Sequence, residues 1–335
     1  MRLLDLIAQG HGAHVFADDG RELPGANRYT AAIQACPLRY VLSDELVRCA
    51  TQLAFAEGDR LSACLDLIRI PAQSLWVEWA DAPRREALKS IPSLDVQDES
   101  PSRHGGALIE AAPDGRSGHL RTFWSAPDER AYLSPIVTTF ALDGQPTPAR
   151  TDDPTVWRGE TLLRMPGEPA IEELLDHLRC HFDEEWAAYY HARCPTDDFR
   201  SAVLYKSLGG CAFDAPILMA LFLLLGARDL LPRQEIRHER LNRIRHQGGK
   251  PSLLEHIELS APLDRPPAKG WVASGEPSRL SPRLHHVRGH IVRRGASVFW
   301  RSPHMRGSAR LGQVRTRTVV LTYGPSAMEP SRAYH

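Results

Sequence analysis

The sequence has few cysteines, and none of them form a pair at the close spacing of a metal site. The six cysteines stand at positions 36, 49, 64, 180, 194 and 211, without any Cys-x-x-Cys pair. This spacing argues against the disulfide framework of a small secreted protein and predicts reduced thiols in a cytoplasmic protein.

Long hydrophobic runs are also missing. The most apolar segment, residues 215–227, has 13 residues, which is too short to cross a bilayer. Asp5 interrupts the first apolar residues too early for them to form the apolar core of a signal peptide. We therefore expect no membrane association and a buried helix over 215–227.

The chain has no net charge, but its two parts differ strongly. Residues 233–335 contain 19 Lys and Arg against seven Asp and Glu, a net charge of +12, and residues 1–232 carry −12. Such asymmetry indicates an anionic partner for the basic part, with nucleic acid first on the list. The alternative is that the two parts dock on each other and cancel their charges.

Internal repeats and low-complexity segments are absent, and the length of 335 residues suggests two or three domains. The predicted fold class is α+β, with an acidic N-terminal body of helices and antiparallel sheet. The expected divisions are an acidic domain over 1–168, a helical segment over 169–232 and a basic Arg/His-rich unit over 233–335, which comprises one helix and about four antiparallel strands.

Local patterns predict the elements of the acidic part. Residues 28–68 are expected to be helical, with Ser43 as an N-cap and an interruption at Gly58. Residues 73–80 alternate like a strand, with Trp76 and Glu78 on its exposed face. Residues 106–126 resemble a hairpin with Pro-Asp-Gly as its turn, and 131–144 a further strand.

Residues 169–335 are predicted to form helices first and strands towards the end of the sequence. Apolar residues from Ile171 to Tyr189 fall on one helical face, and 213–231 and 233–249 are further predicted helices. A C-terminal end at Gly248 and Gly249 is expected for the second of these. The strand candidates are residues 252–260, 283–294, 297–302 and 315–323.

Residues 284–307 contain four histidines and five arginines, a local excess of titratable and basic groups. A hairpin centred on Gly295 would place His286 opposite His304, with Arg288 and His290 on the same face. Imidazoles exchange protons near neutral pH, and a guanidinium holds phosphate with two hydrogen bonds. The candidate catalytic set for metal-independent phosphodiester cleavage is therefore His286, Arg288, His290 and His304.

The same region supplies the candidate nucleic-acid-binding residues, which need positive charge or an aromatic ring that can stack on a base. They are Lys250, Arg293, Arg294, Trp300, Arg301 and Arg306. Binding without chemistry and a purely structural hairpin remain open alternatives. No cofactor is expected, and the sequence leaves RNA versus DNA and the oligomeric state open.

The helical interpretation of residues 171–189 puts His177 and His181 four residues apart, which would let both bind one metal ion. No recognised zinc spacing is met, so no metal site is predicted.

Segments 241–259, HHVRGHIVRR and VFWRSPHMRG resemble a recurrent pattern in uncharacterised phage- and prophage-encoded proteins, in which Gly-Lys-Pro, Arg-Gly-His, an aromatic strand and His-x-Arg-Gly follow one another. The match covers about residues 238–323, and Ile291 stands where an aromatic residue is expected. The resemblance implies a mobile-element origin, a bacterial cytoplasm and a common site at Gly248–Pro251 and Arg288–His290.

The order of one helix and four strands is also similar to that of barnase-like ribonuclease toxins, an analogy of element order alone. A competing class is a non-enzymatic protein, either a virion component or a protein that contacts a host or phage protein.

Overall fold

The computed structural model describes residues 1–9, 13–14, 26–91, 102–125, 127, 130–144, 156–158, 174, 176–183, 186, 192, 214–227, 230–261, 283–287, 290–295, 297–301, 304–306 and 308–313. Their contacts divide the chain into two compact units. Unit 1 comprises residues 1–263 and 291–300, and unit 2 comprises residues 264–290 and 301–335. The fold is α+β, as the sequence predicts.

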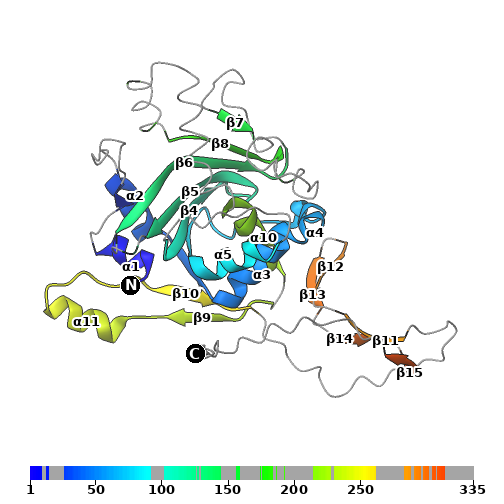
Figure 1. Ribbon diagram of the computed structural model, residues 1–335. Coiled ribbons are helices and arrows are strands. Elements are labelled where there is room, and N and C mark those ends of the chain that lie inside the picture. Colours follow the sequence, from blue (N-terminus) through cyan, green and yellow to red (C-terminus); the bar gives the residue numbers. More distant parts are fainter. Residues whose placement is uncertain are drawn as a thin grey trace, which may run out of the picture. The chain divides into compact units, whose positions relative to one another are not determined.

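Unit 1 is built on one large mixed sheet (Figure 1). Its strands run in the order β7-β8-β6-β5-β4-β3-β2-β10-β9, and β1 pairs with β6. The strands are β1 (Ala13–His14), β2 (Leu38–Leu42), β3 (Ser74–Ala80), β4 (His104–Ala111), β5 (Ser117–Ser125), β6 (Ala131–Ala141), β7 (Val156–Arg158), β8 (Leu178–Phe182), β9 (Arg233–Ile236) and β10 (His256–Leu259). The sheet is mixed rather than antiparallel because β2 pairs in parallel with both β3 and β10.

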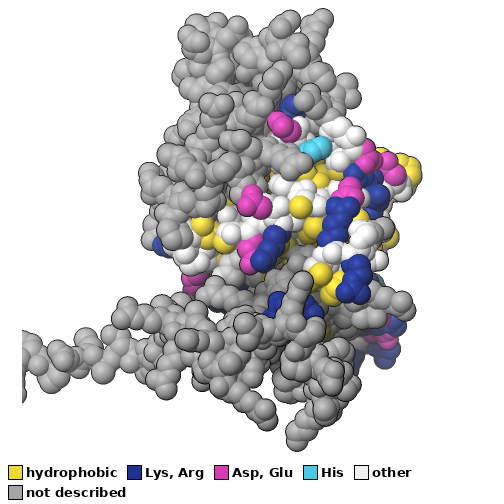
Figure 2. Space-filling view, turned by 90° about the vertical axis from the view of Figure 1, so that its right-hand side faces the viewer, with side chains coloured by type: hydrophobic (Ala, Val, Ile, Leu, Met, Phe, Trp, Pro, Cys, Tyr) yellow, Lys and Arg dark blue, Asp and Glu magenta, His cyan; other side chains and the backbone are white. Residues whose placement is uncertain are grey.

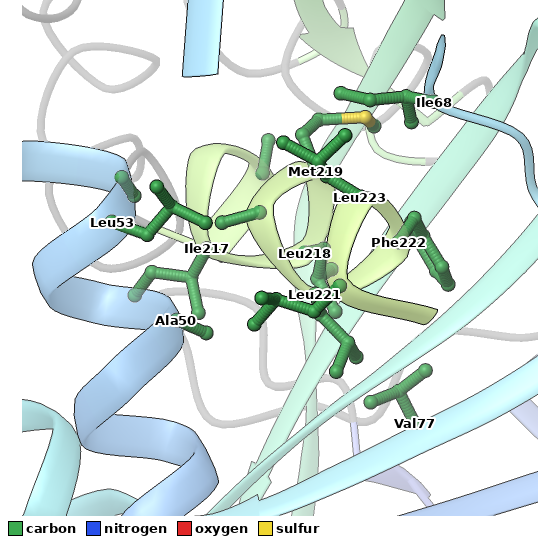
Figure 3. Packing of buried hydrophobic residues seen from close by; sticks show 14 of the residues in the cluster. Ala50, Leu53, Ile68, Val77, Ile217, Leu218, Met219, Leu221, Phe222 and Leu223 are labelled. Carbon is green, nitrogen blue, oxygen red and sulfur yellow. The ribbon is translucent and has the colours of Figure 1, made fainter. Parts of the chain in front are cut away.

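Helices cover one face of the sheet and form the larger core with it. They are α3 (Asp44–Phe55), α4 (Gly58–Ser62), the 3-10 turn η1 (Leu65–Leu67), α5 (Asp81–Lys89) and α10 (Asp214–Gly226). Helix α10 is apolar on every side, and Leu218, Leu221 and Phe222 are fully buried. Figure 3 shows it between α3, which contributes Ala50 and Leu53, and Val77 of β3. A helix that is apolar all round needs such enclosure.

Two helices cover part of the other face. Helices α1 (Leu3–Ala8) and α2 (Ala26–Ala35) bury a second apolar cluster with Trp76 and Phe123. Trp76 and Glu78 are therefore 0% and 1% exposed. The predicted exposure of this side of β3 is wrong, since alternation within one strand does not show whether a helix covers its second face.

The hairpin of β4 and β5, strand β6 and helix α10 confirm the sequence predictions, as does the capping of α3, whose Leu46 N–H donates to the Ser43 hydroxyl. The predicted helix over 28–68 is divided, because β2 lies between α2 and α3. The predicted helix over 171–189 is wrong at its centre, where residues 178–182 form β8.

The basic segment 233–249 begins as a strand and becomes helical only at α11 (Glu239–Gln247), which ends before Gly248 and Gly249 as predicted. Strands β9 and β10 extend the main sheet beyond β2. Residues 233–259 are thus part of unit 1, whereas the sequence analysis grouped them with the C-terminal strands.

The C-terminal strands form two small sheets. Strands β12 (His290–Arg294) and β13 (Ser297–Arg301) form a hairpin that turns at Gly295, as predicted, with φ of 61° at that residue. In unit 2, β11 (Arg283–Val287) pairs with β14 (His304–Arg306) and β15 (Ser308–Gln313). The strand candidate at 315–323 lies outside the described residues.

Within the described part of the chain, no helix combines the length and the apolarity that crossing a membrane requires.

Candidate functional site

The predicted histidine face is not assembled as expected. The strand predicted over 283–294 is divided into β11 and β12, which belong to different sheets. In the β11–β14 pair His286 lies opposite Met305, and His304 lies opposite Val287. The pairing is therefore one residue away from the predicted alignment of His286 with His304. The structure describes the backbone of His286, His290 and His304, and Arg288 lies outside the described residues.

The predicted binding residues are distributed over both units. Lys250 is exposed just after α11, and Arg301 and Arg306 are exposed in β13 and β14. Arg294 is exposed in β12, with its guanidinium 5.7 Å from the centre of the Phe299 ring. The backbone of Trp300 is in β13.

Among the predicted binding residues with a described side chain, Arg293 has the most hydrogen bonds. Its guanidinium donates two hydrogen bonds, of 2.8 and 2.6 Å, to the two carboxylate oxygens of Asp66, beside η1. It also donates to the carbonyl of Ala63 at 2.5 Å. This arginine therefore joins the β12–β13 hairpin to the acidic part of unit 1 and is already occupied by a carboxylate.

A polar row crosses β5, β6 and β8 on the face of the sheet that carries α1 and α2. Thr139 lies opposite His119 in β5 and opposite Arg179 in β8, and Val137 lies opposite His181. The hydroxyl oxygen of Thr139 is 3.2 Å from Nδ1 of His119 and 3.1 Å from Nε2 of His181. Two imidazoles from the strands on either side of β6 thus share one hydroxyl group.

Charged side chains adjoin this row. Arg121, two residues after His119 in β5, donates to Glu110 at 2.5 Å and lies 3.5 Å from Asp183. The Tyr29 hydroxyl donates to Asp183 at 2.5 Å, and the Arg121 guanidinium lies 5.2 Å from the centre of the Tyr29 ring. These contacts fix the guanidinium beside the histidine row.

The row is open to solvent at His119. His119 and Glu110 are exposed, and Thr139 and His181 are half-buried. Partial burial and the positive charge of Arg121 lower the pKa of His119 below 6.5, and Glu110 opposes this effect. His119 is therefore largely neutral at neutral pH and can accept a proton.

Other buried charges serve the core. Arg84 bridges Asp81 and Asp214, at 2.6 and 2.9 Å, and so joins the first turn of α5 to that of α10. Glu78 accepts hydrogen bonds from the backbone N–H groups of Leu3 and Leu4 at 2.7 and 2.8 Å. The indole N–H of Trp76 also donates to it at 3.4 Å, so its described partners are at the start of α1 and in β3 itself.

The metal hypothesis for His177 and His181 loses its helical basis, because His181 is in strand β8. Within the described residues, no group of three or more His, Cys, Asp or Glu side chains is arranged to hold a metal ion. No sequence pattern singled out His119 or Thr139, although the hairpin prediction already placed His119 and Arg121 two residues apart on one strand.

Comparison of the chain with protein-family models, with curated proteins and with solved structures finds no match.

Proposed function

We propose that the chain is a phage or mobile-element protein that binds nucleic acid through the exposed arginines of residues 233–335. The observation that carries this proposal is helix α11, in which no residue is buried. It extends from the β9–β10 edge of unit 1 (Figure 1). A basic surface that the protein itself covered would have little affinity for a polyanion.

The charges of this edge are suited to phosphate. The exposed Lys and Arg side chains from the start of β9 to the turn after α11 are Arg233, Arg237, Arg240, Arg243 and Lys250. Arg237 pairs with Glu235, an exposed contact that a phosphate can replace at little cost. Guanidinium groups bind phosphate oxygens with paired hydrogen bonds, and each such contact releases counterions.

The binding proposal is tested with labelled single-stranded RNA and duplex DNA, by fluorescence anisotropy at 50 and 200 mM salt. Replacing both Arg240 and Arg243 with Glu should weaken binding at least about tenfold at the lower salt concentration and reduce the salt slope by about two. Arg60→Glu, an exposed position of α4, serves as the matched control. Equal binding by the double variant and the control would contradict the proposal.

We extend the proposal to metal-independent cleavage by the histidines of the C-terminal strands, as the sequence pattern suggests. Running each binding sample on a denaturing gel tests this activity. Cleavage that is lost in a variant with both His286→Ala and His290→Ala, while binding is retained, would support it. Unchanged cleavage by that variant would exclude these histidines as the catalytic groups.

Protein binding is the second candidate function. Leu241 and Ile244 on α11 are 45% and 57% exposed, and apolar side chains on a basic helix suit a protein partner. The Arg293–Asp66 pair also favours docking of basic on acidic segments. Figure 2 shows acidic and basic side chains close together on one side of the molecule. Under this alternative, replacing Leu241 and Ile244 with Ser would abolish partner capture and leave RNA binding unchanged.

A further inference from the structure

The row His119–Thr139–His181 has a defined direction of hydrogen bonding. Nδ1 of His181 is 3.1 Å from the carbonyl oxygen of Phe182, which can only accept, so Nδ1 carries the proton. Nε2 of neutral His181 then accepts from the Thr139 hydroxyl. The oxygen of Thr139 in turn accepts from Nδ1–H of His119, which leaves the lone pair of neutral His119 on Nε2.

This order makes His119 a proton acceptor supported by a relay. When Nε2 of His119 takes a proton, its Nδ1 proton can pass to Thr139, and the Thr139 hydroxyl proton can pass to His181. The positive charge is then shared between the exposed and the half-buried imidazole. A base whose second nitrogen is oriented by a further group is the arrangement that general acid–base catalysis uses.

The surroundings of His119 favour this role. Among the described residues, the charged or titratable groups beside it are Glu110 from β4, Arg121 from β5 and His181 from β8, and Thr139 from β6 supplies the hydroxyl. Glu110 and Asp183 hold Arg121 beside the row, where its positive charge favours the neutral form of His119.

We propose that His119, with Thr139 and His181 behind it, is a general acid–base site for cleavage of RNA phosphodiesters, an inference that rests on the proposed nucleic-acid binding. It is an alternative to cleavage by the C-terminal histidines, because it places the chemistry on the main sheet of unit 1, and it names RNA as the substrate class. The ribose 2′-hydroxyl provides the nucleophile, which DNA lacks.

The proposed step moves one proton from the 2′-hydroxyl to the leaving 5′ oxygen through the imidazole of His119. Nε2 of His119 removes the 2′-hydroxyl proton as the 2′ oxygen forms a bond to the adjacent phosphorus. The bond from phosphorus to the 5′ oxygen breaks, and the proton returns from the imidazole to that oxygen. The products are a 2′,3′-cyclic phosphate and a 5′-hydroxyl end, without oxidation or a further reactant.

The experiment uses the full chain and two substrates, a dinucleoside monophosphate and a labelled 20-mer RNA. The 2′-O-methyl form of each substrate, which lacks the nucleophilic hydroxyl, is the negative control. His119→Ala should reduce cleavage of both about 100-fold or more, the usual contribution of a general base, and leave binding of the 20-mer within about twofold. Thr139→Val should reduce cleavage and lower the pH at which it reaches half its maximum, because protonated His119 loses the hydroxyl group that shares its charge. Thr139→Ser should restore both. Circular dichroism of each variant verifies folding.

The outcomes separate this inference from the function on which it rests. Binding of the 20-mer without cleavage of either substrate overturns the inference and keeps the binding proposal. Cleavage of the dinucleoside without binding of the 20-mer supports the inference and contradicts the binding proposal. Full cleavage by His119→Ala, with loss in the His286→Ala and His290→Ala variant, moves the chemistry to the C-terminal strands.

Discussion

Glu78 is a buried carboxyl group whose titration should be visible in protein stability. Burial raises its pKa from 4.5 to about 7, against the opposing effect of the hydrogen bonds from Leu4, Leu3 and Trp76. Between these two pH values the folded protein retains a proton that the unfolded chain releases. The free energy of unfolding should therefore fall as pH rises from about 4.5 to about 7, by about 3 kcal/mol in all.

The measurement is urea denaturation of wild type and Glu78→Gln at pH 5 and pH 8. The variant cannot release this proton, so its stability should decline less between the two pH values. Glu86→Gln, at an exposed carboxylate, controls for the loss of one negative charge. An equal decline in wild type and Glu78→Gln would show that Glu78 does not titrate in this range.

Arg84 is expected to matter far more than an exposed arginine. Its removal in Arg84→Met would leave Asp214 buried without its cation and Asp81 with Arg85 alone, which costs roughly 3–5 kcal/mol. The loss should be smaller at pH 5, because burial raises the pKa of Asp214 to about 7 and its carboxyl group is then neutral. Arg48→Met removes the exposed Arg48–Glu86 pair and should cost less than about 1 kcal/mol. Equal losses in chemical denaturation would contradict this difference.

Among the elements, the β4–β5 hairpin depends on a glycine in its turn. Gly115 has φ of 68°, and a Cβ atom there would lie 2.5 Å from the carbonyl oxygen of Ile70. Gly115→Ala should therefore lower the free energy of unfolding by roughly 2–3 kcal/mol, from the left-handed backbone and the clash together. Gly144→Ala has open space around its Cβ and should be close to neutral. Thermal unfolding of both variants tests this, and equal melting temperatures would contradict it.

Sequence alone could predict the elements whose signals are local. The Pro-Asp-Gly turn, the Ser43 cap and the apolar run of α10 each depend on neighbouring residues. Strand β8 could not be predicted this way. Leu178, Cys180 and Phe182 alternate as a strand requires, but Leu178 and Phe182 also suit a helical face. Pairing with β6, some 40 residues earlier, decides between the two.

The candidate site has the same limitation. His119 and Thr139 fall on strands that the sequence pattern predicts, so two of the three residues of the polar row were within reach of sequence analysis. His181 joins it only through the β6–β8 register, a contact between distant segments. The predicted pairing of His286 with His304 is wrong for a related reason. A shift of one residue in strand register changes which residues lie opposite each other, and the register depends on contacts between distant segments.

For the molecule as a whole, the Arg293–Asp66 pair holds the hairpin of β12 and β13 to the acidic part of unit 1. Both side chains are partly exposed, so Asp66→Asn should change global stability by less than about 1 kcal/mol. It should still increase amide hydrogen exchange in β12 and β13 several-fold, because local opening becomes easier. Asp59→Asn makes the same charge change on α4. Unchanged exchange in Asp66→Asn would mean that other contacts hold the hairpin.

The position of β10 beside β2 also bears on how the protein is made. Tyr40 of β2 pairs with Ile257 of β10, which leaves the ribosome more than 200 residues later. At ordinary synthesis rates this delay is roughly 10–40 s. During that time the nascent chain can form the pairs from β2 to β6 while the outer edge of β2 awaits β10. An edge of this kind invites pairing with other chains, so biogenesis of the protein should depend on chaperones until translation has passed residue 259.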